Sequence, residues 1–443
     1  MSAMKTSIRR VWISFLACFV ALPALAADPA TLKVIAAFNG LGSPAGILEG
    51  SPGVFYSSGT QGSQPVFTIT PQGAITYLAT FPTGVTGGGP FIGGDNGRFY
   101  GTAYTSASRT SSVFSVASLP GSKKVYANLT TNPVFTQNLP DGTLLGFALG
   151  PAGAYDLVTA DLNGNVTPFY EFPAGEVPQF FTLLASDGNY YGVSVLPDGP
   201  AYVYRATPSG SVTKIYNFPS QSFYQDTGPS LIQADDGNLY GTTPKGGDGL
   251  GTIYKLTLDG EYTLLYSMPP AGISQWPGSM LEAGDGNLYG TTSSNFYAPN
   301  GGSSQVFRIT KSGDFSVVAD LNADGLCSCW LIQGSDGVLY GAASWGGQYG
   351  FGSIFSVDAG LPLPRPWAQH FHPDAGPAGT RVRIWGSNLF GAAVEFNGTP
   401  AGTVSNSGSN YVWATVLAGA ATGPIAIVTP GGTITTSDSF TVQ

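Results

Sequence analysis

The amino-acid sequence predicts an all-β protein: a seven-bladed β-propeller with four-stranded blades, followed by an immunoglobulin-like β-sandwich. Three observations predict this fold. A short word containing Tyr-Gly recurs about every 45 to 50 residues, a period typical of propeller blades. The chain holds 63 Gly and 33 Pro but only 10% charged residues, as expected where tight turns join sheets packed on sheets. Long helical periodicity is absent from the sequence.

The repeated word is clearest at residues 236–243 and 285–292, where both copies read Asp-Gly-Asn-Leu-Tyr-Gly-Thr-Thr. Looser copies occupy residues 187–192 and 336–341. Asp-Gly between apolar runs indicates a tight hairpin, because both central positions of the favoured turn need positive φ. We interpret these repeated Asp-Gly pairs as structural. The strand that follows has adjacent apolar residues, so we expect it to be covered on both faces.

Two further words in each repeat predict strands. About a dozen residues after Tyr-Gly comes a stretch such as 253–256, and a third stretch such as 262–266 follows a glycine turn. One repeat therefore supplies four strands. The first strand of the chain, at residues 31–38, precedes any complete repeat, and the last repeat stops after Val357 without a fourth strand. We therefore expect the first strand to complete the last sheet, closing a ring.

Residues 1–26 have the features of a secretory signal peptide: a basic start, an apolar core and a small-residue cleavage site. The apolar run is too short for a transmembrane anchor. A lipid anchor at Cys18 is the remaining alternative. We expect a mature protein that is secreted, periplasmic or on the cell surface, with no transmembrane anchor. Removal of the signal peptide changes the formal charge from −9 to about −12, which argues against nucleic acid as a partner.

The composition changes after residue 360. The predicted propeller covers residues 27–360, and the prolines that follow stiffen a linker at 361–368. Residues 369–443 alternate apolar and polar positions, with turn signals every eight to twelve residues or so, as in a small β-sandwich.

Two families resemble parts of the chain. The runs Gly-Thr-x-Val-x-Ile-x-Gly-x-Asn-Leu at 379–389 and Gly-Pro-Ile at 423–425 are similar to an IPT/TIG domain, an immunoglobulin-like module of extracellular proteins. The repeats resemble the bacterial tandem repeat called GloVer (Gloeo_Verruco), best in the fifth and seventh units through Gly246-Gly247 and Gly346-Gly347. That resemblance implies an exported protein and no known reaction.

The loops on the face away from the Asp-Gly turns vary from repeat to repeat. Variable loops on a rigid scaffold commonly carry binding sites. Aromatic side chains beside short polar ones suit a sugar ring, which has an apolar face and a rim of hydroxyls. The alternative is that these aromatics fill space between blades. The ligand-binding candidates are Phe223, Tyr224, Trp276, Tyr297, Trp330, Trp345 and Tyr349.

Catalytic residues are scarce in the sequence. The only histidines, His370 and His372, lie in the predicted sandwich, so a Ser-His-Asp triad in the propeller is excluded. Copper oxidases of sugars combine a propeller with an immunoglobulin-like domain, but their chemistry needs histidine ligands across the ring. The two histidines could share one strand face and bind a metal; the simpler interpretation is that they are surface residues. We expect no cofactor.

Two carboxylates suffice for glycoside hydrolysis. Asp226 and Asp324, on the loop face, are the weak catalytic candidates. Cys327 and Cys329 are expected to form either a local disulfide or a buried thiol pair, because no second cysteine pair completes a metal site.

The leading hypothesis is a non-catalytic exported scaffold that binds an extracellular glycan or protein through its aromatic-rich loop face. The competing hypothesis is a carbohydrate-active enzyme, a glycoside hydrolase or polysaccharide lyase, that uses carboxylates and tyrosines. A purely structural role is the third.

Overall fold

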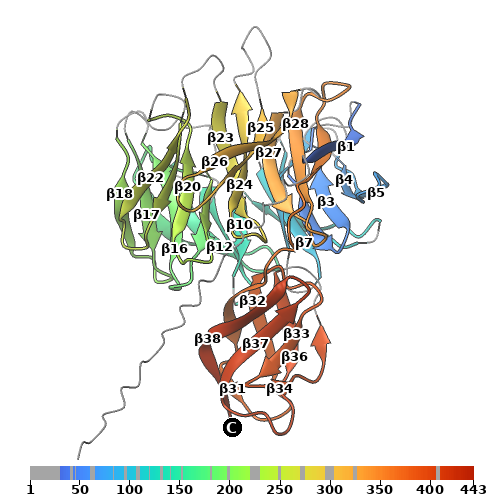
Figure 1. Cartoon of the computed structure of the whole chain (residues 1–443), viewed down its shortest axis with the longest axis vertical. Helices are drawn as coiled ribbons and strands as arrows, with labels where there is room; N and C mark the ends of the chain where they lie inside the picture. Colours follow the sequence, from blue (N-terminus) through green and yellow to red (C-terminus); the bar gives the residue numbers. More distant parts are fainter. Residues whose placement is uncertain are drawn as a thin grey trace, which may run out of the picture.

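The fold is all-β: every regular element among the described residues is a strand. The computed structural model describes residues 30–443 except the segments 40–42, 45, 60–64, 83, 94–96, 106–109, 119, 130–132, 140, 151–152, 180–181, 197–199, 220–229, 248–250, 270–274, 295–303, 323–326 and 406–409. The predicted signal peptide therefore lies outside the described residues. Figure 1 shows the sheets above and a smaller unit below, which contains the C-terminus.

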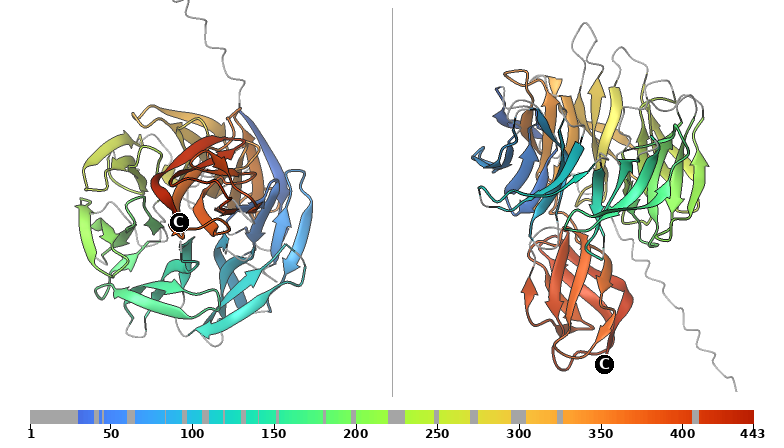
Figure 2. Two further views of the ribbon diagram at one scale, coloured as in Figure 1. Left: turned by 90° about the horizontal axis from the view of Figure 1, so that it is seen from below. Right: turned by 180° about the vertical axis from the view of Figure 1, so that it is seen from behind.

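Consecutive antiparallel sheets occupy residues 31–358 and are arranged in a circle (Figure 2). We call this circle of sheets the ring. Each complete repeat contributes its strands in sequence order, from the inner strand to the outer one. The first sheets are β2 to β5 (Leu48–Ser51, Val54–Ser58, Val66–Ile69, Ile75–Ala79), β6 to β9 (Val85–Gly93, Phe99–Thr105, Thr110–Val116, Lys124–Leu129) and β10 to β13 (Val134–Asn138, Leu144–Leu149, Tyr155–Ala160, Val166–Glu171). The next are β14 to β18 (Val177–Pro178, Leu183–Leu184, Tyr190–Val195, Ala201–Ala206, Val212–Asn217), β19 to β22 (Leu231–Gln233, Leu239–Thr243, Thr252–Leu256, Tyr262–Ser267) and β23 to β26 (Gln275–Glu282, Leu288–Ser294, Gln305–Ile309, Phe315–Asp320).

The last sheet of the ring joins the two ends of the repeat region. Strands β27 (Cys327–Gln333), β28 (Leu339–Trp345) and β29 (Ser353–Asp358) are completed by β1 (Thr31–Ala37). Strand β1 runs antiparallel to β29, with Thr31 opposite Asp358 and Ala37 opposite Ser353. The pairing predicted from the sequence is confirmed: the first strand of the chain completes the sheet of the last repeat, with one register shift between Val34 and Ala36.

The repeated word, which reads Tyr56-Ser57 in the first sheet and Leu145-Gly146 in the third, lies on a central strand of each sheet. Leu239 and Tyr240 of β20 are both fully buried, which confirms that this strand is covered on both faces. The glycine that follows is required for packing: a Cβ built on Gly241 would lie 2.3 Å from the ring of Tyr254 on the next strand, and one on Gly341 would lie 2.1 Å from Phe355. The aromatic residue of the second word therefore fills the space left by the bare glycine of the first.

The Asp-Gly turns differ from the prediction. In the turn after β19, Ala234 and Asn238 face each other, with Ala234 N donating to Asn238 O (3.0 Å) and Gly237 N donating to Ala234 O (2.9 Å). Only Gly237 has positive φ (78°), whereas Asp236 does not, so the expectation of positive φ at both positions is wrong. The loop has three residues, with glycine alone in the left-handed region, a common three-residue hairpin.

The aspartate of this turn accepts hydrogen bonds through both carboxylate oxygens. Asp236 Oδ2 accepts from the hydroxyl of Tyr240 (2.8 Å), and Oδ1 accepts from Asn238 N (3.1 Å). The same bond from the buried tyrosine joins Tyr340 to Asp336 (2.8 Å). Asp and Tyr of the repeated word are therefore one unit, in which the carboxylate satisfies a tyrosine whose ring is in the core.

This unit makes the stability of the protein sensitive to acid. Although burial opposes ionisation, hydrogen bonds from Asn238, Tyr240 and Lys255 lower the pKa of Asp236 to about 2. A carboxyl whose pKa is lowered on folding contributes stability above its unfolded pKa and loses it as the pH falls toward the folded value. We expect Asp236→Asn to lower the free energy of unfolding at neutral pH by about 2 kcal/mol and to weaken the acid sensitivity between about pH 4 and 2.

Urea unfolding across this pH range measures the effect. The exposed Asp259, in another turn of the same sheet, provides the matched control variant Asp259→Asn. Parallel pH curves for wild type and Asp236→Asn would contradict the prediction.

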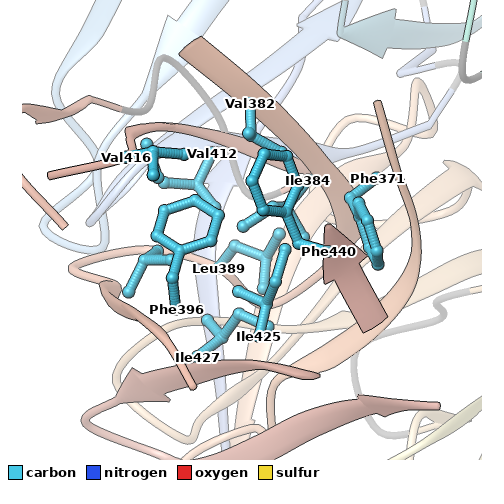
Figure 3. Packing of buried hydrophobic residues seen from close by; sticks show 12 residues of the cluster. Phe371, Val382, Ile384, Leu389, Phe396, Val412, Val416, Ile425, Ile427 and Phe440 are labelled. Atoms are coloured by element: carbon cyan, nitrogen blue, oxygen red, sulfur yellow. The ribbon is translucent and has the colours of Figure 1, made fainter. Parts of the chain in front are cut away.

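The C-terminal unit (residues 367–442) contains two sheets packed across one core. One sheet has the order β30 (Trp367–His372), β32 (Arg381–Ser387), β36 (Tyr411–Thr415) and β35 (Val404–Ser405). The other has the order β31 (Ala375–Gly376), β38 (Gly432–Val442), β37 (Gly423–Thr429), β33 (Ala393–Phe396) and β34 (Thr399–Pro400). Figure 3 shows Ile384, Val412 and Phe371 from the first sheet facing Ile425, Phe396 and Phe440 from the second.

Candidate functional site

The C-terminal unit lies against part of one face of the ring (Figure 2). It lies at the end of the ring that carries the Asp-Gly turns (Figure 1). The linker contacts the ring where Gln333 Nε2 donates to Pro362 O (2.9 Å) and Arg365 pairs with Asp235 (3.5 Å). The C-terminal unit contacts it where Gln369 Nε2 donates to Leu184 O (2.5 Å). The opposite end of the ring, which we call the loop face, points away from the C-terminal unit.

A cavity of about 970 Å³ lies between the ring and the C-terminal unit. It is lined by the inner strands β2, β19, β23 and β27, by the linker and by loops of the C-terminal unit. Its side chains include Glu49, Glu282 and Gln333, each of which already binds the backbone of the ring. The cavity is therefore a crevice between two packed bodies, and its polar groups serve the structure.

Those side chains belong to a set of hydrogen bonds between neighbouring sheets that the sequence analysis did not predict. A Glu or Gln at the end of the inner strand accepts a hydrogen bond from a backbone N–H of the preceding sheet around the ring. We call these residues the latches. The bonds are Gln233 to Ser186 N, Glu282 to Asp235 N, Gln333 to Gly284 N and Glu49 to Ser335 N, each at 2.8 Å.

A sequence signal for the latches exists. Glu49, Gln233, Glu282 and Gln333 each stand seven residues before the tyrosine of their repeat. The Glu49 latch differs from the others because it joins the first repeat to the last. Its Oε1 also accepts from Gly53 N and from Ser335 Oγ, both at 2.8 Å.

The candidates on the loop face fall into two groups. Trp330, Trp345 and Tyr349 have described side chains. The others lie outside the described residues, either whole or in their side chains: Phe223, Tyr224, Tyr297, Asp226 and Asp324 as whole residues, and Trp276, Cys327 and Cys329 in their side chains.

Trp330 packs into the ring. Its half-buried side chain contacts the buried cluster that includes Phe55, Tyr340 and Ile354. This is the space-filling role considered as the alternative for the loop-face aromatics.

The hairpin between β28 and β29 exposes three aromatic side chains. Trp345 is 46% exposed, Tyr349 49% and Phe351 38%. Strand β28 begins at the Asp-Gly turn and ends at Trp345, so this hairpin lies at the opposite end of the strand from the C-terminal unit. We call residues 345–351 the aromatic hairpin. Sequence analysis named its first two aromatics as ligand candidates, and Phe351 is a third exposed aromatic on the same hairpin.

Backbone bonds fix the shape of the aromatic hairpin. Gly350 N donates to Gly347 O (3.1 Å), and Gly352 N donates to Gly346 O (2.9 Å). At its base, Phe38 N donates to Gly352 O (3.1 Å), and Ser344 Oγ donates to Pro44 O (3.3 Å). The chain segment after β1 therefore holds the hairpin, which presents its aromatic side chains on a preformed support.

The two histidines lie on the surface of the C-terminal unit. His370 and His372 are exposed on β30 and flank the buried Phe371, so they share one strand face as predicted. Burial against neighbours such as Trp385 lowers the pKa of His370, and the charge of His372 acts in the same direction. Within the described residues, no group of three or more His, Cys, Asp or Glu side chains is placed to hold a metal ion.

No helix with the length and hydrophobicity to cross a bilayer occurs in the described part of the chain.

Comparison with known proteins identifies a family and a fold. The sequence model of the Gloeobacter/Verrucomicrobia repeat matches residues 177–417. The structure is similar to the BP39L lectin from Burkholderia pseudomallei, with a TM-score of 0.51 and 15% identity over 71% of this chain and 99% of the lectin. It is also similar to the GH74 xyloglucanase from Xanthomonas campestris, with a TM-score of 0.50 and 14% identity over 94% of this chain and 75% of the enzyme.

A copper-bound fungal alcohol oxidase of the AA5 family gives a TM-score of 0.49 and 12% identity over 94% of this chain and 99% of the oxidase. Among curated proteins, no relative of the sequence is found. The lectin and the xyloglucanase show that the ring has a propeller-like fold.

Proposed function

This chain belongs to the Gloeobacter/Verrucomicrobia repeat family, and from that premise and the geometry of its loop face we propose that it is an exported, non-catalytic protein that binds a glycan through the aromatic hairpin. In this proposal residues 1–26 are a signal peptide and residues 27–360 a seven-bladed β-propeller. Residues 361–368 form the linker, and residues 369–443 an immunoglobulin-like domain of the IPT/TIG type that supports the propeller from below.

The exposure of the aromatic hairpin carries this proposal. Three large aromatic side chains, each more than a third exposed, project from one short loop. Exposed aromatics on a rigid hairpin provide flat apolar surfaces for the faces of sugar rings, while the amide of Gln348 and the backbone groups of the glycines suit their hydroxyls.

The small size of the hairpin favours a glycan over a protein partner. A stable protein interface needs about 800 Å² from each partner, more than one seven-residue hairpin provides. Further support for a carbohydrate comes from the two neighbours with the higher TM-scores, a lectin and a xyloglucanase, which share the propeller-like fold.

The hairpin itself argues for binding rather than catalysis. Residues 345–351 contain no carboxylate, histidine or lysine that could act as an acid, base or nucleophile. The alternative, a carbohydrate-active enzyme, would need carboxylates such as Asp226 and Asp324 on the same face.

Polysaccharide pull-down and glycan-array binding test the proposal. We expect the double variant Trp345→Ala with Tyr349→Ala to bind at least about tenfold more weakly than wild type, because stacking on each aromatic ring is worth about 1 kcal/mol or more. Tyr77→Ala is the matched control: Tyr77 is 45% exposed, but it lies on the outermost strand β5 of another sheet.

Unchanged glycan binding in the double variant would refute the role of the hairpin. Release of reducing ends or unsaturated sugars by the wild type, lost in Asp226→Asn, would establish the enzyme alternative instead.

A further inference from the structure

The equivalent hairpin of the fifth repeat shows which features of the aromatic hairpin its fold requires. Both hairpins follow the Tyr-Gly strand, which ends at Thr243 in the fifth repeat and at Trp345 in the seventh. Both contain a Gly-Gly pair, Gly246-Gly247 in one and Gly346-Gly347 in the other. At the far end, Gly251 and Gly352 both have positive φ, at 105° and 83°. A Cβ on either glycine would lie 2.3 Å from a carbonyl of the preceding strand and 2.9 Å from a proline of the neighbouring repeat. The two hairpins therefore rest on the same backbone supports.

Their side chains differ, and the seventh repeat has one more residue between its Gly-Gly pair and the far glycine. The fifth repeat places Lys245 before its Gly-Gly pair and Asp248 after it, where the seventh repeat places Trp345 and Gln348. Because the backbone of the fifth repeat carries Lys245 before its Gly-Gly pair, the fold does not require a tryptophan there. The whole stretch from Ala342 to Val357 carries no charged side chain. The aromatic and uncharged residues at these positions therefore determine the chemistry of the exposed loop surface and are not needed for the backbone fold.

From this contrast we infer that the ligand of the aromatic hairpin is an uncharged polysaccharide. The inference rests on the proposed function and specifies its ligand. A polymer of uronates or sulfated sugars would need arginine or lysine to pair with its anions. The hairpin offers none, and the chain as a whole has a formal charge of −9, which repels a polyanion at a distance.

A neutral chain needs only what the hairpin presents. Trp345 and Tyr349 supply surfaces for two sugar rings, and the Gln348 amide can both donate to and accept from hydroxyls. Binding through stacking and neutral hydrogen bonds is insensitive to salt, whereas binding through ion pairs weakens as the ionic strength rises.

Affinity electrophoresis and titration calorimetry on the full chain test this inference. The neutral probes are xyloglucan, galactomannan and mixed-linkage β-glucan, and the anionic probes are polygalacturonate and alginate. Each is measured at about 0.05 M and 0.5 M NaCl, between which the screening length falls from about 14 to 4 Å. We expect at least one neutral polymer to bind with the same affinity at both salt concentrations, and the anionic polymers to bind at least about tenfold more weakly.

The variant that tests the hairpin directly carries the residues of the fifth repeat, Trp345→Lys with Gln348→Asp. Because the backbone of the fifth repeat carries Lys245 and Gln348 is exposed, the variant should keep the melting temperature of the wild type while its affinity for the neutral polymer falls at least about tenfold. Tyr77→Lys, at an exposed aromatic on the outer strand β5, is the control for adding a lysine.

The outcomes distinguish failure of the uncharged-ligand inference from failure of the proposed glycan-binding function. Tighter, salt-sensitive binding of an anionic polymer that is lost in Trp345→Ala would overturn the uncharged ligand but keep the aromatic hairpin as the binding site. Binding of both polymer classes that is unaffected by Trp345→Ala and by the double exchange would remove the proposed function and the inference together.

Discussion

Replacing Gly341 with alanine is expected to lower the free energy of unfolding by about 3 kcal/mol, at the upper end of the range for overpacked cores. The added Cβ would lie 2.1 Å from Phe355 Cζ, and both residues are in the centre of the sheet that closes the ring. Phe355 is fully buried and cannot move away without disturbing the neighbouring sheet. Urea unfolding followed by fluorescence measures the loss.

A second substitution and a control identify the cause. Phe355→Leu in the Gly341→Ala background should recover part of the stability, so that the two changes are strongly non-additive in a double-mutant cycle. Gly93→Ala is the matched control, because its Cβ would lie at an ordinary distance of 3.8 Å from Phe99. A loss of less than about 1 kcal/mol in Gly341→Ala would show that the aromatic ring does not need the bare glycine.

Removing the Glu49 latch should lower the free energy of unfolding by a similar amount. Glu49→Ala removes the acceptor for Ser335 N and Gly53 N, and a buried donor left without a partner costs about 1 to 3 kcal/mol. We expect the free energy of unfolding to fall by about 3 kcal/mol, since these bonds join residues at opposite ends of the repeat region. In contrast, Glu49→Gln should be tolerated, because Gln233 and Gln333 already act as latches in their own repeats.

The Glu49 variants also differ in their pH dependence. Burial raises the pKa of Glu49, and the hydrogen bonds from Gly53 and Ser335 offset only part of that rise. A carboxyl whose pKa is raised on folding favours the folded state when protonated, and this stability is lost as the pH rises through the folded pKa. The stability of Glu49→Gln relative to wild type should therefore increase from pH 4 to pH 8 or so. A constant difference across that range would contradict this account.

Much of the ring could be predicted from the sequence because its main features are local. The spacing of the Tyr-Gly words predicted one sheet for each repeat, and the surplus strand at 31–38 predicted the pairing of β1 with β29. The predicted turn conformation was wrong, because the Asp-Gly rule assumes a two-residue loop and the loop has three residues. The rule also takes no account of the bond between the aspartate and Tyr240, four residues further on.

The rest depends on contacts between distant segments. The latches were missed because a single Glu or Gln at the end of a strand resembles any surface residue until the repeats are aligned on their tyrosines. The side of the ring that meets the C-terminal unit is decided by Gln333, Arg365 and Gln369 reaching partners elsewhere in the chain. Sequence alone also could not separate Trp330, which packs in the core, from Trp345, which is exposed.

The strand that closes the ring is synthesised long before its partner. A ribosome makes β1 first and its partner β29 about three hundred residues later, which at about 5 to 20 residues per second leaves β1 single for tens of seconds. Throughout that interval an uncovered strand edge can pair with another nascent chain. A binding partner that shields this edge until β29 emerges would therefore raise the yield of folded protein, and chains truncated before β29 should accumulate in inclusion bodies.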